Sequence, residues 1–267
     1  MDARPIGIFD SGLGGLTAAK VLEEIMPDEN IIYFGDSANA PYGTRERDDL
    51  IRLARANTAF LQSFDCKAVL VACGTVSSNA MDVLRAEFDL PFFDMIEAAC
   101  RTAVATTRTG RIAVIATEAT IRKDAFAQRL KQLDANVQCF SKACQSLVTV
   151  AEQGHFAAGD PIGAAAIAQE LAPVKAWGPD VLIMACTHFP LLQEHIAAFL
   201  GEGVALLSVG AESARALKAQ LAQRDMLAPG TVVSRRWFTS GDPAEFSANA
   251  ALFLGHGVQA ERKEDGQ

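Results

Sequence analysis

The sequence predicts an α/β protein made of two pseudo-symmetric α/β domains with mostly parallel sheets and an active site in the inter-domain cleft. Short apolar runs alternate with helical patterns, which is the signature of stacked βαβ units. Cys73 and Cys186 lie in nearly the same local sequence, an apolar run that ends in Ala-Cys. Segments 6–11 and 112–118 also match each other, since each is an apolar run followed by a polar pair that opens a helix.

The strands expected, in chain order, are 6–9, 31–34, 69–72, 112–116, 181–184 and 204–207. Each is a short apolar run of the kind that is buried on both faces of a parallel sheet. The last helix begins after Asp242, which can cap it; Pro243 suits the first turn and Glu245 completes a capping box.

The two pairs of matching segments recur at similar offsets, which predicts two similarly built halves. We expect a first α/β domain of residues 1–98 plus 209–267, carrying Cys73. Residues 99–208 would form the second domain, carrying Cys186. Ligand sites favour clefts between such domains.

Charge and composition narrow the possible partners. The 267 residues include 24 basic and 32 acidic side chains, a formal net charge of −8, with no Lys/Arg-rich stretch. This balance argues against nucleic acid and anionic membranes as partners, so an anionic ligand would be held by local N–H groups and hydroxyls.

The expected cellular compartment is inferred from the targeting and membrane-spanning segments looked for in the sequence. No secretory signal and no apolar run of membrane-spanning length is visible, so we expect a cytoplasmic protein. There, reduced thiols are expected in place of disulfides. The six cysteines concerned are Cys66, Cys73, Cys100, Cys139, Cys144 and Cys186.

Cys73 and Cys186 are the main candidates for chemistry. Most strand cysteines are small core residues, and either one alone would be read that way. Two thiols at the carboxyl ends of matching strands suit reversible proton transfer at a carbon stereocentre, with a base on one face and an acid on the other. A helix N-terminus or a neighbouring His can bring a thiol pKa toward neutrality, and His188 stands two residues after Cys186.

The loop after the first expected strand, residues 10–15, allows three interpretations. Its glycines and Asp36 weakly resemble a dinucleotide fingerprint, but Asp10 and Ser11 intrude and Thr17 replaces the third small residue. The glycines could instead let the backbone approach a small ligand while Asp10 reaches Cys73, or Asp10 could simply cap a helix.

The turn-rich loop 35–44 is a second candidate for binding, because such loops on rigid scaffolds carry functional groups. We expect no metal. Cys186 and His188 supply only two ligands, and the pair Cys139 and Cys144 has neither a Cys-x-x-Cys spacing nor a second pair of ligands. No lysine pattern indicates a pyridoxal site, so no cofactor is expected.

Together these motifs resemble the cofactor-independent aspartate/glutamate racemases. The segments that carry the resemblance are 7–16, 33–36, 41–43, 72–73, 115–120, 186–190 and 210–212. They are spread over nearly the whole chain, and in combination they are highly specific.

The resemblance implies interconversion of L- and D-glutamate, which supplies D-glutamate for bacterial peptidoglycan. It implies that Cys186 takes the α-proton from L-glutamate and Cys73 that from D-glutamate. Asp10 would assist Cys73, while Glu152 and His188 would assist Cys186.

The resemblance also implies a set of substrate contacts and a homo-oligomer, expected to be a dimer. The implied contacts with glutamate are Asp10, Ser11, Tyr42, Gly43, Gly74, Thr75, Thr187 and His188. Three departures from the family pattern stand out: Gly74 where Asn is usual, Gln145 where Pro is usual, and residues 208–209 where Asp-Ser is common.

These departures keep two alternatives open. One is a racemase of aspartate or another amino acid on the same fold, because Gly74 removes an amide that could contact the substrate. The other is a non-catalytic protein that binds a small molecule.

Overall fold

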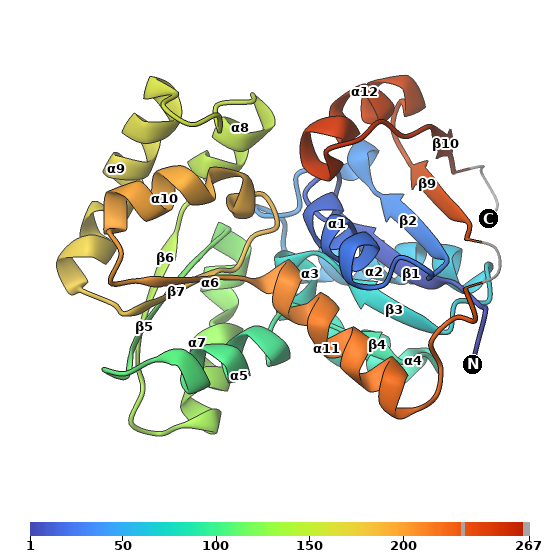
Figure 1. Ribbon diagram of the computed structural model, residues 1–267, viewed down its shortest axis with the longest axis horizontal. Helices are drawn as coiled ribbons and strands as arrows, with labels where there is room; N and C mark the ends of the chain where they lie inside the picture. The colour runs from blue at the N-terminus through green and yellow to red at the C-terminus, as the bar shows by residue number, and fades with distance from the viewer. Residues whose placement is uncertain (231–232, 264–267) are drawn as a thin grey trace.

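The computed structural model describes residues 1–230 and 233–263, whose strands form two separate sheets (Figure 1). In the first sheet the order is β10 (Ala260–Arg262), β9 (Arg235–Thr239), β2 (Ile31–Gly35), β1 (Ile6–Asp10), β3 (Ala68–Val71) and β4 (Phe92–Phe93). In the second it is β6 (Gln138–Ala143), β5 (Arg111–Ala116), β7 (Val181–Met184) and β8 (Ala205–Ser208). We call each sheet with its helices the first half and the second half.

The two sheets repeat one pattern. All the strand pairings in the described residues are parallel, and the order β2-β1-β3-β4 in the first half matches β6-β5-β7-β8 in the second. Phe9 pairs with Val71, and Ile115 with Met184, so the two strands that lead to Cys73 and Cys186 flank equivalent central strands. The predicted pseudo-symmetric α/β fold is thereby confirmed.

All six predicted strands are present, with ends that differ by at most one residue. Four further strands of the described residues were not predicted: β4, β6, β9 and β10. Strand β4 has only two residues, and β6 is a partly exposed edge strand with Ser and Lys among its residues. Such strands lack the continuous apolar run that identified the others.

Helices connect the strands and cover the sheets. In chain order they are α1 (Leu16–Ile25), α2 (Arg47–Gln62), α3 (Gly74–Asn79), α4 (Met81–Glu87), α5 (Glu97–Thr106), α6 (Glu118–Lys123), α7 (Ala125–Leu133), α8 (Ser146–Glu152), α9 (Pro161–Trp177), α10 (Gln193–Leu200), α11 (Val209–Gln223) and α12 (Pro243–Leu254), with short 3₁₀ turns η1 (Ser37–Asn39) and η2 (Phe189–Leu192). Asp242 caps α12 as predicted, accepting from the N–H groups of Ala244 (2.7 Å) and Glu245 (3.0 Å). Within 1–230 and 233–263, no helix has the length and apolar character needed to span a membrane.

One hydrophobic core runs through both halves. Ile8 and Leu70 of the first sheet share a cluster of buried side chains with Val114 and Ile183 of the second. The opposite face of each sheet packs into a cluster of its own. The two halves are therefore joined by continuous apolar packing, which is the dominant favourable contribution to folding.

Within residues 1–230 and 233–263 the chain crosses between the halves twice, and the two crossings lie side by side. It passes from β4 through Asp94 into α5, and returns from β8 into α11. The Ser213 hydroxyl donates to the Asp94 carbonyl oxygen (2.7 Å), and the Thr102 hydroxyl donates to Glu212 Oε2 (2.8 Å). Helices α5 and α11 are thus held against each other where the halves connect.

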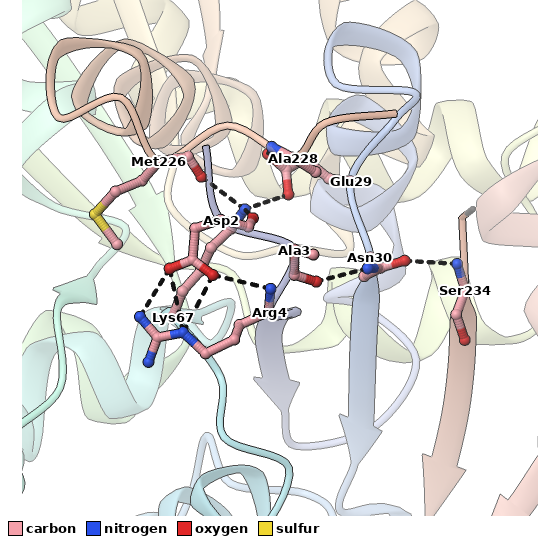
Figure 2. A network of polar contacts seen from close by, with 9 residues as sticks. All are labelled: Asp2, Ala3, Arg4, Glu29, Asn30, Lys67, Met226, Ala228 and Ser234. Carbon is pink, nitrogen blue, oxygen red and sulfur yellow. Dashed lines mark hydrogen bonds and ion pairs between the residues drawn. The ribbon is translucent and has the colours of Figure 1, made fainter. Parts of the chain in front are cut away.

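A buried ion pair ties together the amino-terminal edge of the first sheet (Figure 2). Lys67 Nζ donates to Glu29 Oε2 (2.6 Å) and to the carbonyl oxygens of Asp2 (2.7 Å) and Met226 (2.8 Å). Glu29 Oε1 accepts from the Ala228 N–H (2.8 Å). Both charges are therefore paired, and they join segments that are far apart in sequence.

Candidate active site

Cys73 and Cys186 occupy equivalent positions, each two residues after the end of its strand. Their exposed fractions are 4% and 6%. Both lie where the carboxyl ends of the two sheets meet. We call this place the junction: it is formed by the loops after β1, β2 and β3 and those after β5, β6 and β7.

Cys186 has a histidine partner, as the spacing suggested. The Cys186 Sγ lies 3.7 Å from His188 Nδ1, and His188 Nε2 lies 3.0 Å from Glu152 Oε1. Burial alone would lower the pKa of His188, but the contacts with Cys186 and Glu152 outweigh it and raise that pKa to about 10. The hydrogen bond to His188 holds the pKa of Glu152 below its ordinary value. A charged imidazolium therefore stands beside the Cys186 sulfur at neutral pH.

Cys73 lies in different surroundings. Burial, together with the nearby Asp10 carboxylate, raises the pKa of the Cys73 thiol well above its ordinary value. Burial also raises the pKa of Asp10, although the His188 charge and the N–H of Gly15 act in the opposite direction. Asp10 Oδ2 accepts from the N–H groups of Gly12 (3.2 Å) and Gly15 (2.9 Å), so the carboxyl is held within its own loop.

Residues of the second half act on residues of the first half across the junction. After burial and Asp10, the neighbouring Cys186 makes a smaller contribution to the raised pKa of Cys73, and the His188 charge acts on Asp10. Direct contacts join the halves at the same place: the Thr17 hydroxyl donates to the Thr187 carbonyl oxygen (2.9 Å), and the hydroxyls of Thr75 and Thr117 lie 2.9 Å apart. The structure thus places Cys73, Cys186, Asp10, His188 and Glu152 around one junction.

Hydroxyl groups surround the thiols. Thr75 and Thr187 are both buried, and Ser11 is partly buried at the end of β1. The Thr75 hydroxyl lies 2.9 Å from that of Thr117, which lies 3.0 Å from that of Thr120. These are the neutral donors that an anionic ligand would need in an acidic protein.

The side chain of Tyr42 has partners within the first half. Its hydroxyl donates to Asp36 Oδ2 and accepts from Asn57 Nδ2 (3.1 Å). A contact between Tyr42 and a ligand would therefore come from its backbone. Gly43, the next residue, lies directly at the junction, where its carbonyl oxygen accepts from the Ala119 N–H (2.9 Å).

Sequence reasoning gave Thr117, Thr120 and Gln145 no place at the junction, although segment 115–120 carries the family resemblance and Gln145 is a departure from the family pattern. For Thr117 a further signal was present, because segment 112–118 matches the segment that ends in Asp10 and Ser11. Their places depend on how the two halves face each other, which no local pattern reveals. Within the described part of the chain, no group of three or more His, Cys, Asp and Glu side chains is arranged to hold a metal ion.

Comparisons with known proteins agree with this arrangement. A family model described as Asp/Glu/Hydantoin racemase matches residues 17–224. Glutamate racemase from Corynebacterium diphtheriae is 41% identical over 256 residues, which are 96% of this chain and 96% of that protein.

Two crystal structures show the same fold. Glutamate racemase isoform RacE1 from Bacillus anthracis superposes with a TM-score of 0.95 at 32% identity, covering 99% of both chains. Glutamate racemase from Francisella tularensis, in complex with D-glutamate, gives a TM-score of 0.90 at 31% identity, covering 99% of this chain and 98% of that one.

Proposed function

Because this chain belongs to the Asp/Glu/Hydantoin racemase family, we propose that it is an amino-acid racemase that interconverts L- and D-glutamate without a cofactor. One observation carries the proposal. Two thiols from equivalent strand ends, Cys73 and Cys186, reach the same junction, and each has a charged group of its own beside it. A base and an acid on opposite faces of one carbon are what inversion by proton transfer requires.

The surroundings of the two thiols fit the direction from L- to D-glutamate. The Cys186 thiolate, paired with the His188 imidazolium, removes the α-proton of L-glutamate. The raised pKa of Cys73 keeps that thiol protonated, so it delivers a proton to the opposite face of the carbanion. D-glutamate results, and the negative charge then resides on Cys73.

The roles exchange when D-glutamate binds. Cys73 must then act as the base: Asp10, whose pKa is raised by burial, takes up the Cys73 proton, and His188 passes its proton to the Cys186 thiolate, which then delivers it to the carbanion. Glu152 holds His188 in position through the hydrogen bond at Nε2. The protonation of Cys73 is thus adjusted by Asp10, and that of Cys186 by His188 together with Glu152.

We assign the substrate carboxylates to hydroxyls and backbone N–H groups at the junction. The residues proposed are Ser11, Tyr42 through its backbone, Gly43, Gly74, Thr75, Thr187 and His188. The low exposure of both thiols means that the halves must separate to admit a substrate.

The cellular setting is proposed on the same basis. The units that move would be residues 1–98 with 209–267, and residues 99–208, in keeping with the division of strands between the two sheets. Thiols that must stay reduced favour the cytoplasm, where D-glutamate would enter peptidoglycan synthesis. The resemblance to the family supports a homodimer.

Replacing each thiol tests the proposal directly. Circular dichroism should follow racemisation from either enantiomer, and NMR should follow exchange of the α-hydrogen with deuterium oxide. Cys73→Ser and Cys186→Ser should each abolish racemisation, while Cys139→Ser, which alters a thiol outside the junction, should leave it unchanged. Full activity in either junction variant would contradict the mechanism. Turnover of aspartate with glutamate inert would contradict the substrate.

A further inference from the structure

Three glycines of the first half lie where side chains would collide with the second half. A β-carbon on Gly74 would overlap the carbonyl oxygen of Ala185. One on Gly43 would lie 2.6 Å from Gln145 Oε1, and one on Gly14 would lie 2.6 Å from His188 Cε1. The space that a side chain would take is therefore occupied by the opposite half at each of these positions.

At these three positions glycine is required because there is no room for a side chain, and not because of the backbone conformation. None of the three has the positive φ angle that would strain another residue, in contrast to Gly178 or Gly201. Alanine could adopt the same backbone at Gly14, Gly43 or Gly74 within the first half alone. The obstacle is the neighbouring half.

The contact at Gly74 is the least able to yield. Gly74 directly follows Cys73, and Ala185 directly precedes Cys186, so the two thiol-bearing turns touch through their backbones. The Ala185 N–H donates to the Ile115 carbonyl oxygen (2.8 Å), which fixes this peptide to the second sheet. With the halves closed as they are in this chain, a β-carbon at position 74 therefore requires the two turns to move apart.

The close approach also permits hydrogen bonds between the halves. The Thr17 hydroxyl donates to the Thr187 carbonyl oxygen (2.9 Å), and the Ala119 N–H donates to the Gly43 carbonyl oxygen (2.9 Å). Glycine at the contact points lets these groups come within range. The glycines and the hydrogen bonds together define a closed position.

We propose that Gly14, Gly43 and Gly74 are positioning residues that set how far the two halves close, and thereby the separation of the Cys73 and Cys186 sulfurs. This inference rests on the proposed racemase function, because only a reaction that uses both thiols on one carbon needs that separation. Proton transfer is sensitive to such spacing, and a displacement of about 1 Å can cost about 100-fold in rate.

Gly74→Ala is the principal test. We expect kcat to fall about 10- to 100-fold, with a smaller change in KM, because the thiols are held too far apart. Exchange of the substrate α-hydrogen with deuterium oxide should fall less than racemisation, since one thiol can still remove and return a proton. Gly203→Ala is the matched control, because a β-carbon there meets no neighbour within 4 Å.

Thiol alkylation gives a readout that does not depend on turnover. In the closed position both sulfurs are buried, so iodoacetamide should modify Cys73 and Cys186 faster in Gly74→Ala than in the wild type. Peptide mass spectrometry would assign the sites, and circular dichroism would verify folding. If the wild type turns over neither enantiomer, the proposed function fails, while the alkylation rates still decide the present inference.

Gly43→Ala provides an independent variant should Gly74→Ala not fold. Its β-carbon meets the flexible end of Gln145, so adding Gln145→Ala should restore part of the lost kcat; the nearby Thr117 limits the recovery. Wild-type kcat, exchange ratio and alkylation rates in a folded Gly74→Ala or Gly43→Ala protein would overturn the inference.

Discussion

Removal of the Lys67 ammonium should be among the most destabilising single changes in this chain. In Lys67→Met the side chain keeps its length, but the three hydrogen bonds to Glu29, Asp2 and Met226 are lost. The Glu29 carboxylate, 3% exposed, keeps the N–H of Ala228 as its partner in a site built for a cation. Burial of such an uncompensated charge is costly.

The expected loss is about 3–5 kcal/mol of unfolding free energy, the range for removing one member of a buried pair. Native domains are stable by only about 5–15 kcal/mol, so this is a large fraction of the total. Adding Glu29→Gln should recover part of the loss, because the double variant no longer buries an unpaired charge.

Urea unfolding can be followed separately in the two halves. Each half contains one of the two tryptophans, since Trp237 lies in β9 and Trp177 in α9. In a Trp177→Phe background, fluorescence therefore reports on the half that contains Lys67. Arg55→Met, which breaks the exposed pair between Arg55 and Glu87, is the control and should leave the midpoint nearly unchanged. A Lys67→Met midpoint equal to that of the control would refute the reasoning.

Three further predictions concern the junction and its support. Tyr42→Phe removes the buried donor to Asp36 and should lower the free energy of unfolding by about 1–3 kcal/mol, measured by urea titration. Glu152→Gln removes one of the contacts that raise the pKa of His188, so the alkaline limb of the pH–rate profile should move to lower pH. In that variant kcat/KM should fall by the same factor for both enantiomers, because they have equal free energies. The pKa of His188 rises from 6.5 to about 10 on folding, so protonated His188 stabilises the folded state fully below pH 6.5, and this stabilisation is lost as the pH rises through 10. Thermal melts of His188→Gln should lack this pH-dependent part of the stability.

Each of these outcomes has a clear opposite. A urea unfolding midpoint of Tyr42→Phe equal to that of the wild type would show that the Tyr42 hydroxyl contributes nothing to the free energy of unfolding. An alkaline limb unchanged by Glu152→Gln would separate Glu152 from His188. Parallel stability curves for the wild type and His188→Gln between pH 6.5 and 10 would contradict the pKa assignment.

The central strands and the pair of thiols were predictable because their signals are local. An apolar run ending in Ala-Cys identifies both a buried strand and its functional end, and its repetition at Cys73 and Cys186 exposed the pseudo-symmetry. Strands β4 and β6 escaped prediction because short or half-exposed strands carry no such run.

The contacts across the junction could not be predicted in the same way. Gly74 could be recognised as unusual, but its contact with the Ala185 carbonyl depends on how the two halves face each other. The hydroxyl pair of Thr75 and Thr117 depends on the same arrangement. The roles of Cys73 and Cys186 in catalysis remain predictions for the experiments described.

In the separation of the halves proposed above, the paired crossings at Asp94 and Ser213 would serve as the pivot, because they are fastened to each other. They leave the sheets from β4 and β8, which lie next to β3 and β7, the strands that lead to Cys73 and Cys186. A rotation about this pivot moves nearby groups least. Among the turns that touch across the junction, those after β2 and β6, which meet at Gly43 and Gln145, lie furthest from it in strand order and would therefore move most. The opening through which the amino acid enters would therefore form between Gly43 and Gln145, and both enantiomers would leave through the same opening.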